Sequence, residues 1–135
     1  MSSIAAFLEG KSLEGEIREI EFPRFKDKDG KPAIIKIKNI NAIENERILK
    51  MSRVIRKMKG KEELVLDNEL YLDNLITNMI IEPNFADPDL LNKLKVSTPA
   101  IAIKSLLSAG EYIKLTTEIT KMLGIDTDLG DIAKN

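Results

Sequence analysis

Two stretches near the N-terminus, residues 16–22 and 33–40, have the pattern of β-strands. Apolar and polar residues alternate more cleanly in the second stretch than in the first, where Ile17 and Ile20 face opposite sides. Between the two stretches, Asp29-Gly30 favours a two-residue type I′ turn, because both central positions need a positive φ that glycine adopts without strain. The sequence therefore predicts an antiparallel β-hairpin over about residues 16–40.

A turn centred on this dipeptide fixes the pairing of the strands, with Phe22 opposite Ile37 and Glu21 opposite Lys38. One face of the hairpin is then apolar, and it carries Ile20, Phe22, Ile35 and Ile37. An isolated hairpin is only marginally stable in water, so we expect other elements to cover this face.

Downstream of the hairpin, apolar residues recur at helical spacing. Asn41 is a good N-cap for a helix over residues 42–59, whose buried stripe would be Ile48, Met51, Val54, Ile55 and Met58. Asp67 or Asn68 begins the next helix, which Pro83 ends. Its apolar face contains Leu72, Leu75, Ile76, Met79 and Ile80.

Three further helices are predicted in the C-terminal half. Asp87-Pro88 and Thr98-Pro99 each place an N-cap before a proline at the first helical position, which predicts short helices near residues 88–95 and 99–107. A last helix is expected over residues 111–123. Near the N-terminus, the apolar cluster at residues 4–8 is long enough for one or two helical turns.

These elements predict an α+β fold in which an N-terminal antiparallel β-hairpin is followed by four to five α-helices packed as a small helical domain. We expect residues 1–135 to form a single domain, with a helical part over about residues 41–124. The polar residues 125–135 are expected to fray.

Composition narrows the chemistry that this chain can perform. It contains no cysteine and no histidine, which removes thiolate chemistry and the commonest general base and metal ligand. The formal net charge is −1, so no long-range field favours nucleic acid. No stretch approaches the ~20 apolar residues of a membrane span, and no signal peptide is evident. We therefore expect a cytoplasmic protein that does not contact the membrane.

Three short motifs resemble binding sites and fail on spacing. Gly10-Lys11-Ser12 lacks the preceding glycine and strand of a phosphate-binding loop. The calcium-loop candidates at residues 27–30 and 126–128 lack ligands at the required positions. The many carboxylates, such as Glu62-Glu63, form no dyad in an apolar pocket. We expect no catalytic residue, no metal, no cofactor and no small-molecule substrate.

A basic stripe runs from Arg47 to Lys61 and has two interpretations. It could contact nucleic acid, but the chain is nearly neutral and no aromatic residue interrupts the stripe, so a solvated helix face is favoured. Four methionines fall on the predicted apolar helix faces, where core packing is favoured over an adaptable binding surface: Met51, Met58, Met79 and Met122.

Several motifs resemble the XkdN-like family of phage tail assembly chaperones. The turn sequence from Arg24 to Pro32 (Arg-Phe-Lys-Asp-Lys-Asp-Gly-Lys-Pro) is similar to that family's hairpin, and the stretch from Asn41 to Glu46 is similar to its helix start. Leu106-Leu107-Ser108-Ala109-Gly110-Glu111-Tyr112 resembles the family's step between its last two helices, and Gly124-Ile125-Asp126 resembles its closing stretch. The chain departs from the family at Ile35 and Ile125, where members often carry Trp and Phe.

The resemblance implies a non-enzymatic chaperone that binds apolar helical segments of the tape measure protein in the bacterial host cytoplasm during tail morphogenesis. Such a protein needs an apolar groove for its partner. The candidate partner-binding residues are Leu106, Tyr112, Leu115, Ile119 and Met122, although a core position is favoured for most of them. One alternative is a structural tail or virion subunit that self-associates through hairpin edges. Another is a nucleic-acid-binding protein that uses the basic stripe.

Overall fold

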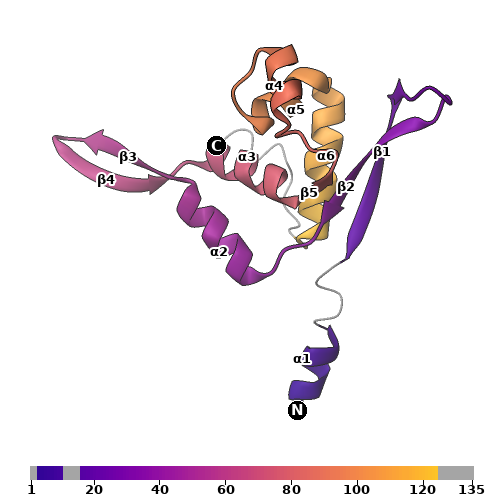
Figure 1. Ribbon diagram of the computed structural model, residues 1–135. Coiled ribbons are helices and arrows are strands. Elements are labelled where there is room, and N and C mark those ends of the chain that lie inside the picture. Colours follow the sequence, from indigo (N-terminus) through magenta and orange to yellow (C-terminus); the bar gives the residue numbers. More distant parts are fainter. Residues whose placement is uncertain (1–2, 11–15, 125–135) are drawn as a thin grey trace.

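The computed structural model describes residues 3–10 and 16–124, and it confirms the α+β class (Figure 1). The first half contains α1 (Ile4–Gly10), β1 (Ile17–Lys26), β2 (Pro32–Lys38), α2 (Ala42–Met51), β3 (Arg53–Met58) and β4 (Lys61–Leu66). The second half contains α3 (Asn68–Met79), β5 (Ile80–Glu82), α4 (Pro88–Leu94), α5 (Pro99–Leu106) and α6 (Ala109–Met122). The described residues form six helices: α1 precedes the hairpin, and five helices follow it, where four to five were expected. Residues 125–135, predicted to fray, lie outside this part.

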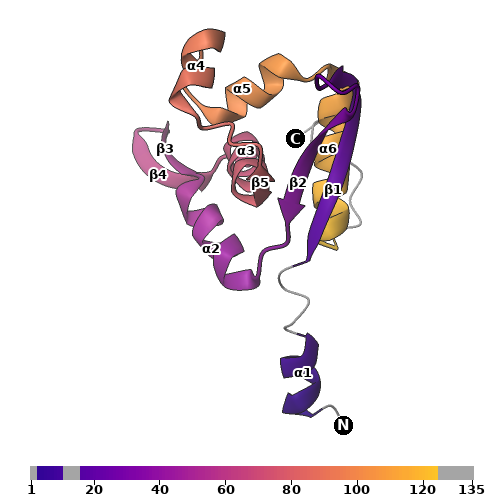
Figure 2. The same ribbon diagram turned by 45° about the vertical axis from the view of Figure 1, so that its right-hand side comes forward.

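The N-terminal hairpin forms from β1 and β2 as predicted, and its apolar face is the expected one. Ile20, Phe22, Ile35 and Ile37 are all buried in the core. Helix α6 packs against this face (Figure 2). The Nζ atom of Lys114 on α6 lies 5.2 Å from the centre of the Phe22 ring. The hairpin therefore obtains from α6 the cover that its apolar face requires.

The predicted register of the hairpin was wrong. Phe22 lies opposite Ala33 instead of Ile37, and Glu21 lies opposite Ile34 instead of Lys38. The ladder shifts between Phe22 and Lys26, around a proline that has no N–H to donate. The slip is by four positions, an even number, so every side chain stays on the face that was predicted.

The turn also differs from the expected two-residue type. The backbone N–H of Gly30 donates to the Asp27 carbonyl at 3.0 Å, and Gly30 alone of the turn residues has a positive φ, of 81°. The Asp27 side chain accepts from the backbone N–H groups of Asp29 and Lys31. This is a three-residue loop closed by a glycine, another common hairpin connection.

Strand β5 adds a third strand to this sheet, in the order β1-β2-β5. Ile80 was expected in the preceding helix, but α3 ends at Met79 and Ile80 pairs with Ile37 of β2. On the outer face of the sheet, the Nζ atom of Lys36 lies 3.8 Å from Glu19 and 3.5 Å from Glu82.

The predicted helix over residues 42–59 was also wrong. It begins after the expected N-cap, Asn41, but α2 ends at Met51, and residues 53–58 form a strand that pairs with β4. Lys59 and Gly60 connect the two strands with φ values of 52° and 79°, the positive values that a two-residue type I′ turn requires. The stripe that fitted a helix therefore belongs to two different elements.

The remaining helices confirm the predicted caps. The Asp67 side chain accepts a hydrogen bond from the backbone of α3, and Asp87 and Thr98 do the same for α4 and α5. Ser108 caps α6, a few residues before the predicted start. The core combines the hairpin face with the inner faces of four helices: Ile20, Phe22, Ile35, Ile37, Ile48, Leu75, Ile76, Met79, Ile103, Leu115, Ile119 and Met122.

Candidate functional site

The structure separates the five candidate partner-binding residues into two groups. Leu115 and Ile119 are 0% exposed and Met122 is 7% exposed, because this side of α6 packs into the core. Leu106 at the end of α5 and Tyr112 on α6 are half-buried. Three of the five residues thus stabilise the fold in this conformation, and their role as partner contacts stays a prediction.

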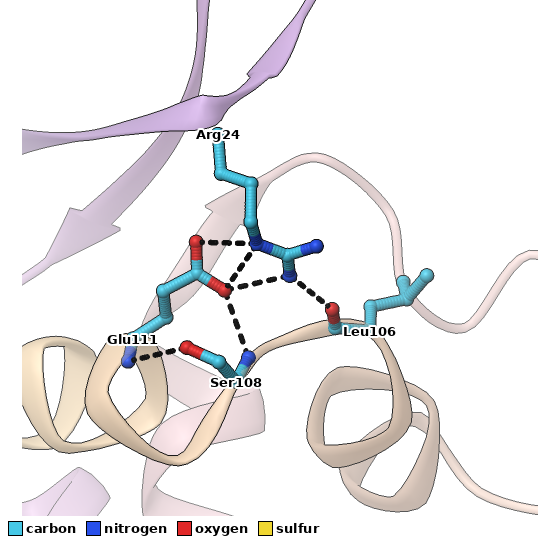
Figure 3. Close-up of polar contacts among 4 residues, drawn as sticks. All are labelled: Arg24, Leu106, Ser108 and Glu111. Carbon is cyan, nitrogen blue, oxygen red and sulfur yellow. Dashed lines mark hydrogen bonds and ion pairs between the residues drawn. The ribbon is translucent and has the colours of Figure 1, made fainter.

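The side chain of Arg24 on β1 reaches the junction between α5 and α6, where it contacts the Glu111 carboxylate and the Leu106 main-chain carbonyl (Figure 3). Its guanidinium donates to both carboxylate oxygens of Glu111, with an Nη2–Oε1 distance of 2.7 Å, and to the main-chain carbonyl of Leu106 at 3.0 Å. The guanidinium carbon also lies 4.1 Å from the centre of the Phe25 ring. The planar guanidinium thus fixes the hairpin to the step between two helices.

Glu111 also closes the N-terminus of α6. Its Oε1 accepts from the Ser108 backbone N–H at 2.8 Å, while the Ser108 hydroxyl accepts from the Glu111 backbone N–H at 3.2 Å. These contacts lower the pKa of Glu111 to about 2. The hydrogen bonds from Arg24 have the largest effect, and the bond from the Ser108 backbone has the next largest. Sequence reasoning missed this ion pair, although both residues lie in motifs that carry the family resemblance.

Tyr112 lies beside a second ion pair, which joins α3 to α5. The Nζ of Lys104 is 2.7 Å from an Asp73 carboxylate oxygen and 5.8 Å from the centre of the Tyr112 ring. Burial, with the nearby charges of Asp73 and Glu69, raises the pKa of Tyr112 to about 12. Tyr112 is thus a half-buried residue of α6 beside the ion pair that joins α3 to α5.

The β3–β4 hairpin (residues 53–66) projects from the body of the molecule (Figure 1). Within the described residues, β3 and β4 pair with each other and pack extensively against no other helix or strand. Ile55 and Leu64 lie directly opposite each other and are 67% and 62% exposed, and the neighbouring Leu66 is 40% exposed. We call Ile55, Leu64 and Leu66 the apolar face of the hairpin, since all three point to the same side.

The basic stripe from Arg47 to Lys61 is not one helix face. Arg47 and Lys50 lie on α2, whereas five basic residues lie on or between β3 and β4: Arg53, Arg56, Lys57, Lys59 and Lys61. Glu62 and Glu63 are the acidic residues of the same hairpin, so its formal net charge is +3. Arg56 contacts Asp67 at 3.8 Å, and Lys57 lies opposite Glu62 in the ladder.

The four methionines predicted to lie on apolar helix faces divide into two buried and two exposed residues. Met79 and Met122 are buried, as expected for core positions. Met51 at the end of α2 and Met58 on β3 are exposed, so the interpretation of these two as core residues was wrong. Helix α1 presents a further exposed apolar stripe formed by Ile4, Phe7 and Leu8.

The described residues contain no cluster of acidic side chains that could hold a metal ion. None of the helices in this part of the chain is long and apolar enough to span a membrane. The calcium-loop candidate at residues 126–128 and the Lys11 and Ser12 of the phosphate-loop candidate lie outside the described residues. The β3–β4 hairpin combines exposed apolar and basic side chains on one projecting element.

Comparisons with known proteins agree with the motifs. The family model of the phage XkdN-like tail assembly chaperone proteins matches residues 4–135. The phage-like element PBSX protein XkdN of Bacillus subtilis (strain 168) is 29% identical over 140 aligned positions, which cover 98% of this chain and 93% of that protein. The crystal structure of the protein yqbn is similar in fold, with a TM-score of 0.72 and 21% identity over 93% of this chain and 99% of that chain.

Proposed function

The chain belongs to the family of XkdN-like phage tail assembly chaperones, and from this premise we propose that it binds apolar helical segments of the tape measure protein during tail morphogenesis. A family of tail assembly chaperones implies phage tail proteins as partners. We propose that the complex forms in the cytoplasm of the bacterial host and that the role is one of binding, without catalysis.

The observation that carries this proposal is the exposed apolar face of the β3–β4 hairpin. Ile55, Leu64 and Leu66 lie on an element that the body of the molecule does not cover. Exposed apolar side chains that gather on one surface, rimmed by charged ones, mark interaction sites. A chaperone of amphipathic helices needs such a surface, because the helices bury their apolar stripes on it.

The five residues predicted from the sequence remain a second candidate surface. Leu106 and Tyr112 are partly accessible, whereas Leu115, Ile119 and Met122 would be reached only if α6 moved away from the sheet. Binding through the hairpin needs no such movement. Substitutions on the two surfaces therefore distinguish them.

The test is co-expression of this chain with the tape measure protein of the same phage or prophage, followed by affinity purification through a tag on this chain. We expect the tape measure protein to remain in the supernatant and to co-purify at a defined stoichiometry. The paired variant Leu106→Ser/Tyr112→Ser tests the second surface in the same assay.

Precipitation of the tape measure protein while this chain remains alone in the supernatant would contradict the proposed partner. In that case, mass spectrometry of purified phage particles tests the structural-subunit alternative. Recovery of this chain at a fixed copy number per particle would assign it to the virion instead.

A further inference from the structure

We propose that the apolar face of the β3–β4 hairpin binds an amphipathic helix whose apolar stripe is flanked by acidic residues. This inference rests on the proposed function for the helical nature of the partner. The position of the site and the charge of the helix are inferred from the hairpin itself.

The pairing of the two strands defines the surface. From base to tip, the side chains on this face are Arg53 opposite Leu66, Ile55 opposite Leu64, and Lys57 opposite Glu62. All six are exposed. An apolar centre is thus bounded on the β3 side by a cation at each end.

The size of the surface fits a helix. Each strand has six residues and rises about 3.3 Å per residue, so the face is about 20 Å long. A helix advances about 5.4 Å per turn, so about four turns match this length. Apolar side chains at positions i, i+3 or i+4, and i+7 of such a helix would cover Ile55, Leu64 and Leu66.

Charge decides which kind of helix fits. On this face Arg53 and Lys57 are basic and Glu62 is acidic, so its net charge is +1, and Lys59 in the adjoining turn adds a further positive charge. Arg53, Lys57 and the turn residue Lys59 are all exposed. Acidic residues beside the apolar stripe of the partner would lie near these cations, whereas basic residues there would be repelled.

Attachment of the hairpin to the body supports a fixed docking surface. Ser52 at its base is fully buried, and its hydroxyl donates to the Ile48 carbonyl at 2.7 Å and accepts from the Asn74 side chain at 3.0 Å. The Ser52 carbonyl accepts from the Asp67 N–H at 2.9 Å, which joins the two ends of the hairpin. The base is therefore tied to both α2 and α3 while the tip is free to meet a partner.

The experiment uses the full chain and two synthetic peptides of about 20 residues. Both form helices with the same leucine stripe, flanked by Glu in one peptide and by Lys in the other. We expect the Glu peptide to bind at least tenfold more tightly in titration calorimetry at low salt. The variant Ile55→Ser/Leu64→Ser should weaken this binding at least tenfold, whereas Ile43→Ser, at a 77% exposed position on α2, should leave it unchanged.

A charge-reversal variant keeps the test valid if the serine variant disrupts the hairpin. Arg53→Glu/Lys57→Glu retains the apolar face and should reverse the preference, so that the Lys peptide binds more tightly. Equal binding of the two peptides, or an unchanged preference in this variant, would overturn the proposal. Loss of self-association in the hairpin variants, measured by analytical ultracentrifugation, would instead assign the face to a second copy and overturn it too.

These outcomes are separable from the test of the proposed function. If the variant Ile55→Ser/Leu64→Ser captures the tape measure protein as well as the wild-type chain does, the proposed function stands but the hairpin is not the binding site. The expected peptide preference, without capture of the tape measure protein by the wild-type chain, would support the site and contradict the proposed partner.

Discussion

Arg24 and Glu111 are separated by 87 residues in the sequence, and their side chains lie 2.7 Å apart between Nη2 and Oε1. Arg24 comes from the N-terminal hairpin, and Glu111 comes from the first turn of α6. Two of the motifs that resemble the tail assembly chaperone family, residues 24–32 and 106–112, are thus joined by one ion pair. This pair fixes the hairpin over the helix that covers its apolar face.

The Glu111 carboxylate should make the stability of the protein depend on pH. Its pKa is lowered from 4.5 to about 2 in the folded state, so its contribution is fully present above about pH 4.5 and is lost as the pH falls towards 2. We expect Glu111→Gln to lower the midpoint of urea unfolding at pH 7. The difference from the wild-type protein should shrink steadily between pH 4.5 and pH 3.

Glu62→Gln on the exposed β3–β4 hairpin is the matched control, because it changes the net charge equally. It should change the midpoint far less than Glu111→Gln does at pH 7. A constant difference between Glu111→Gln and the wild-type protein at all pH values would show that the ion pair is not the cause.

Truncation of a core residue on α6 should destabilise the whole fold. Ile119→Ala leaves a cavity at a fully buried position and should cost about 2–5 kcal/mol of unfolding free energy. Ile113→Ala on the same helix is the control, because Ile113 is 57% exposed and should cost less than about 0.5 kcal/mol. Urea unfolding measures both values. Wild-type stability of Ile119→Ala with loss of partner binding would reassign Ile119 as a partner contact.

The turn of the β3–β4 hairpin can be strengthened or weakened without touching its faces. Lys59 has a φ of 52°, which asparagine tolerates better than lysine, so Lys59→Asn should stabilise the hairpin by a few tenths of a kcal/mol. Gly60→Ala, at a φ of 79°, should destabilise it by about 1 kcal/mol. Amide exchange across residues 53–66 should then be roughly fivefold faster in Gly60→Ala. Unchanged exchange in both variants would contradict the turn assignment.

Ser52→Ala should destabilise the base of the same hairpin. The substitution removes both hydrogen bonds of the buried hydroxyl and leaves the Asn74 amide without this partner, at a cost of about 1–3 kcal/mol. Ser52→Ala/Asn74→Leu removes both polar groups and should recover part of the loss. Chemical denaturation of the three proteins checks this order, and a double variant less stable than Ser52→Ala would contradict it.

Local sequence signals correctly predicted several helix caps and the apolar faces of α3 and the N-terminal hairpin, because these features depend on residues that are close together in the chain. N-caps such as Asp67 and Thr98 accept hydrogen bonds from their own helices, and they were located correctly. The stripe of α3 and the apolar face of the hairpin follow from periodicity alone. That face survived a four-residue error in register, because side chains alternate with a period of two.

The error over residues 42–59 has a local cause as well. Val54, Ile55 and Met58 fit a helical stripe, but they also fit a strand that ends at the Lys59-Gly60 turn. The signal that could have found the hairpin is symmetry about this turn. Apolar residues pair with apolar ones, and basic with acidic: Val54 with Val65, Ile55 with Leu64, Arg56 with Glu63, and Lys57 with Glu62.

By itself, the sequence determined the α+β class, most of the core helices with their caps, and the apolar face of the N-terminal hairpin, because hydrophobic periodicity and capping act within a few residues along the chain. Only the tertiary structure decided the register around Pro23, the pairing of β5 with β2, and the contact of Arg24 with Glu111. It also decided that Leu115 and Ile119 are buried while Ile55 and Leu64 are exposed. These features depend on which segments, distant in the sequence, pack against each other. An apolar residue is buried only where another segment covers it, so the residue type alone does not decide its burial.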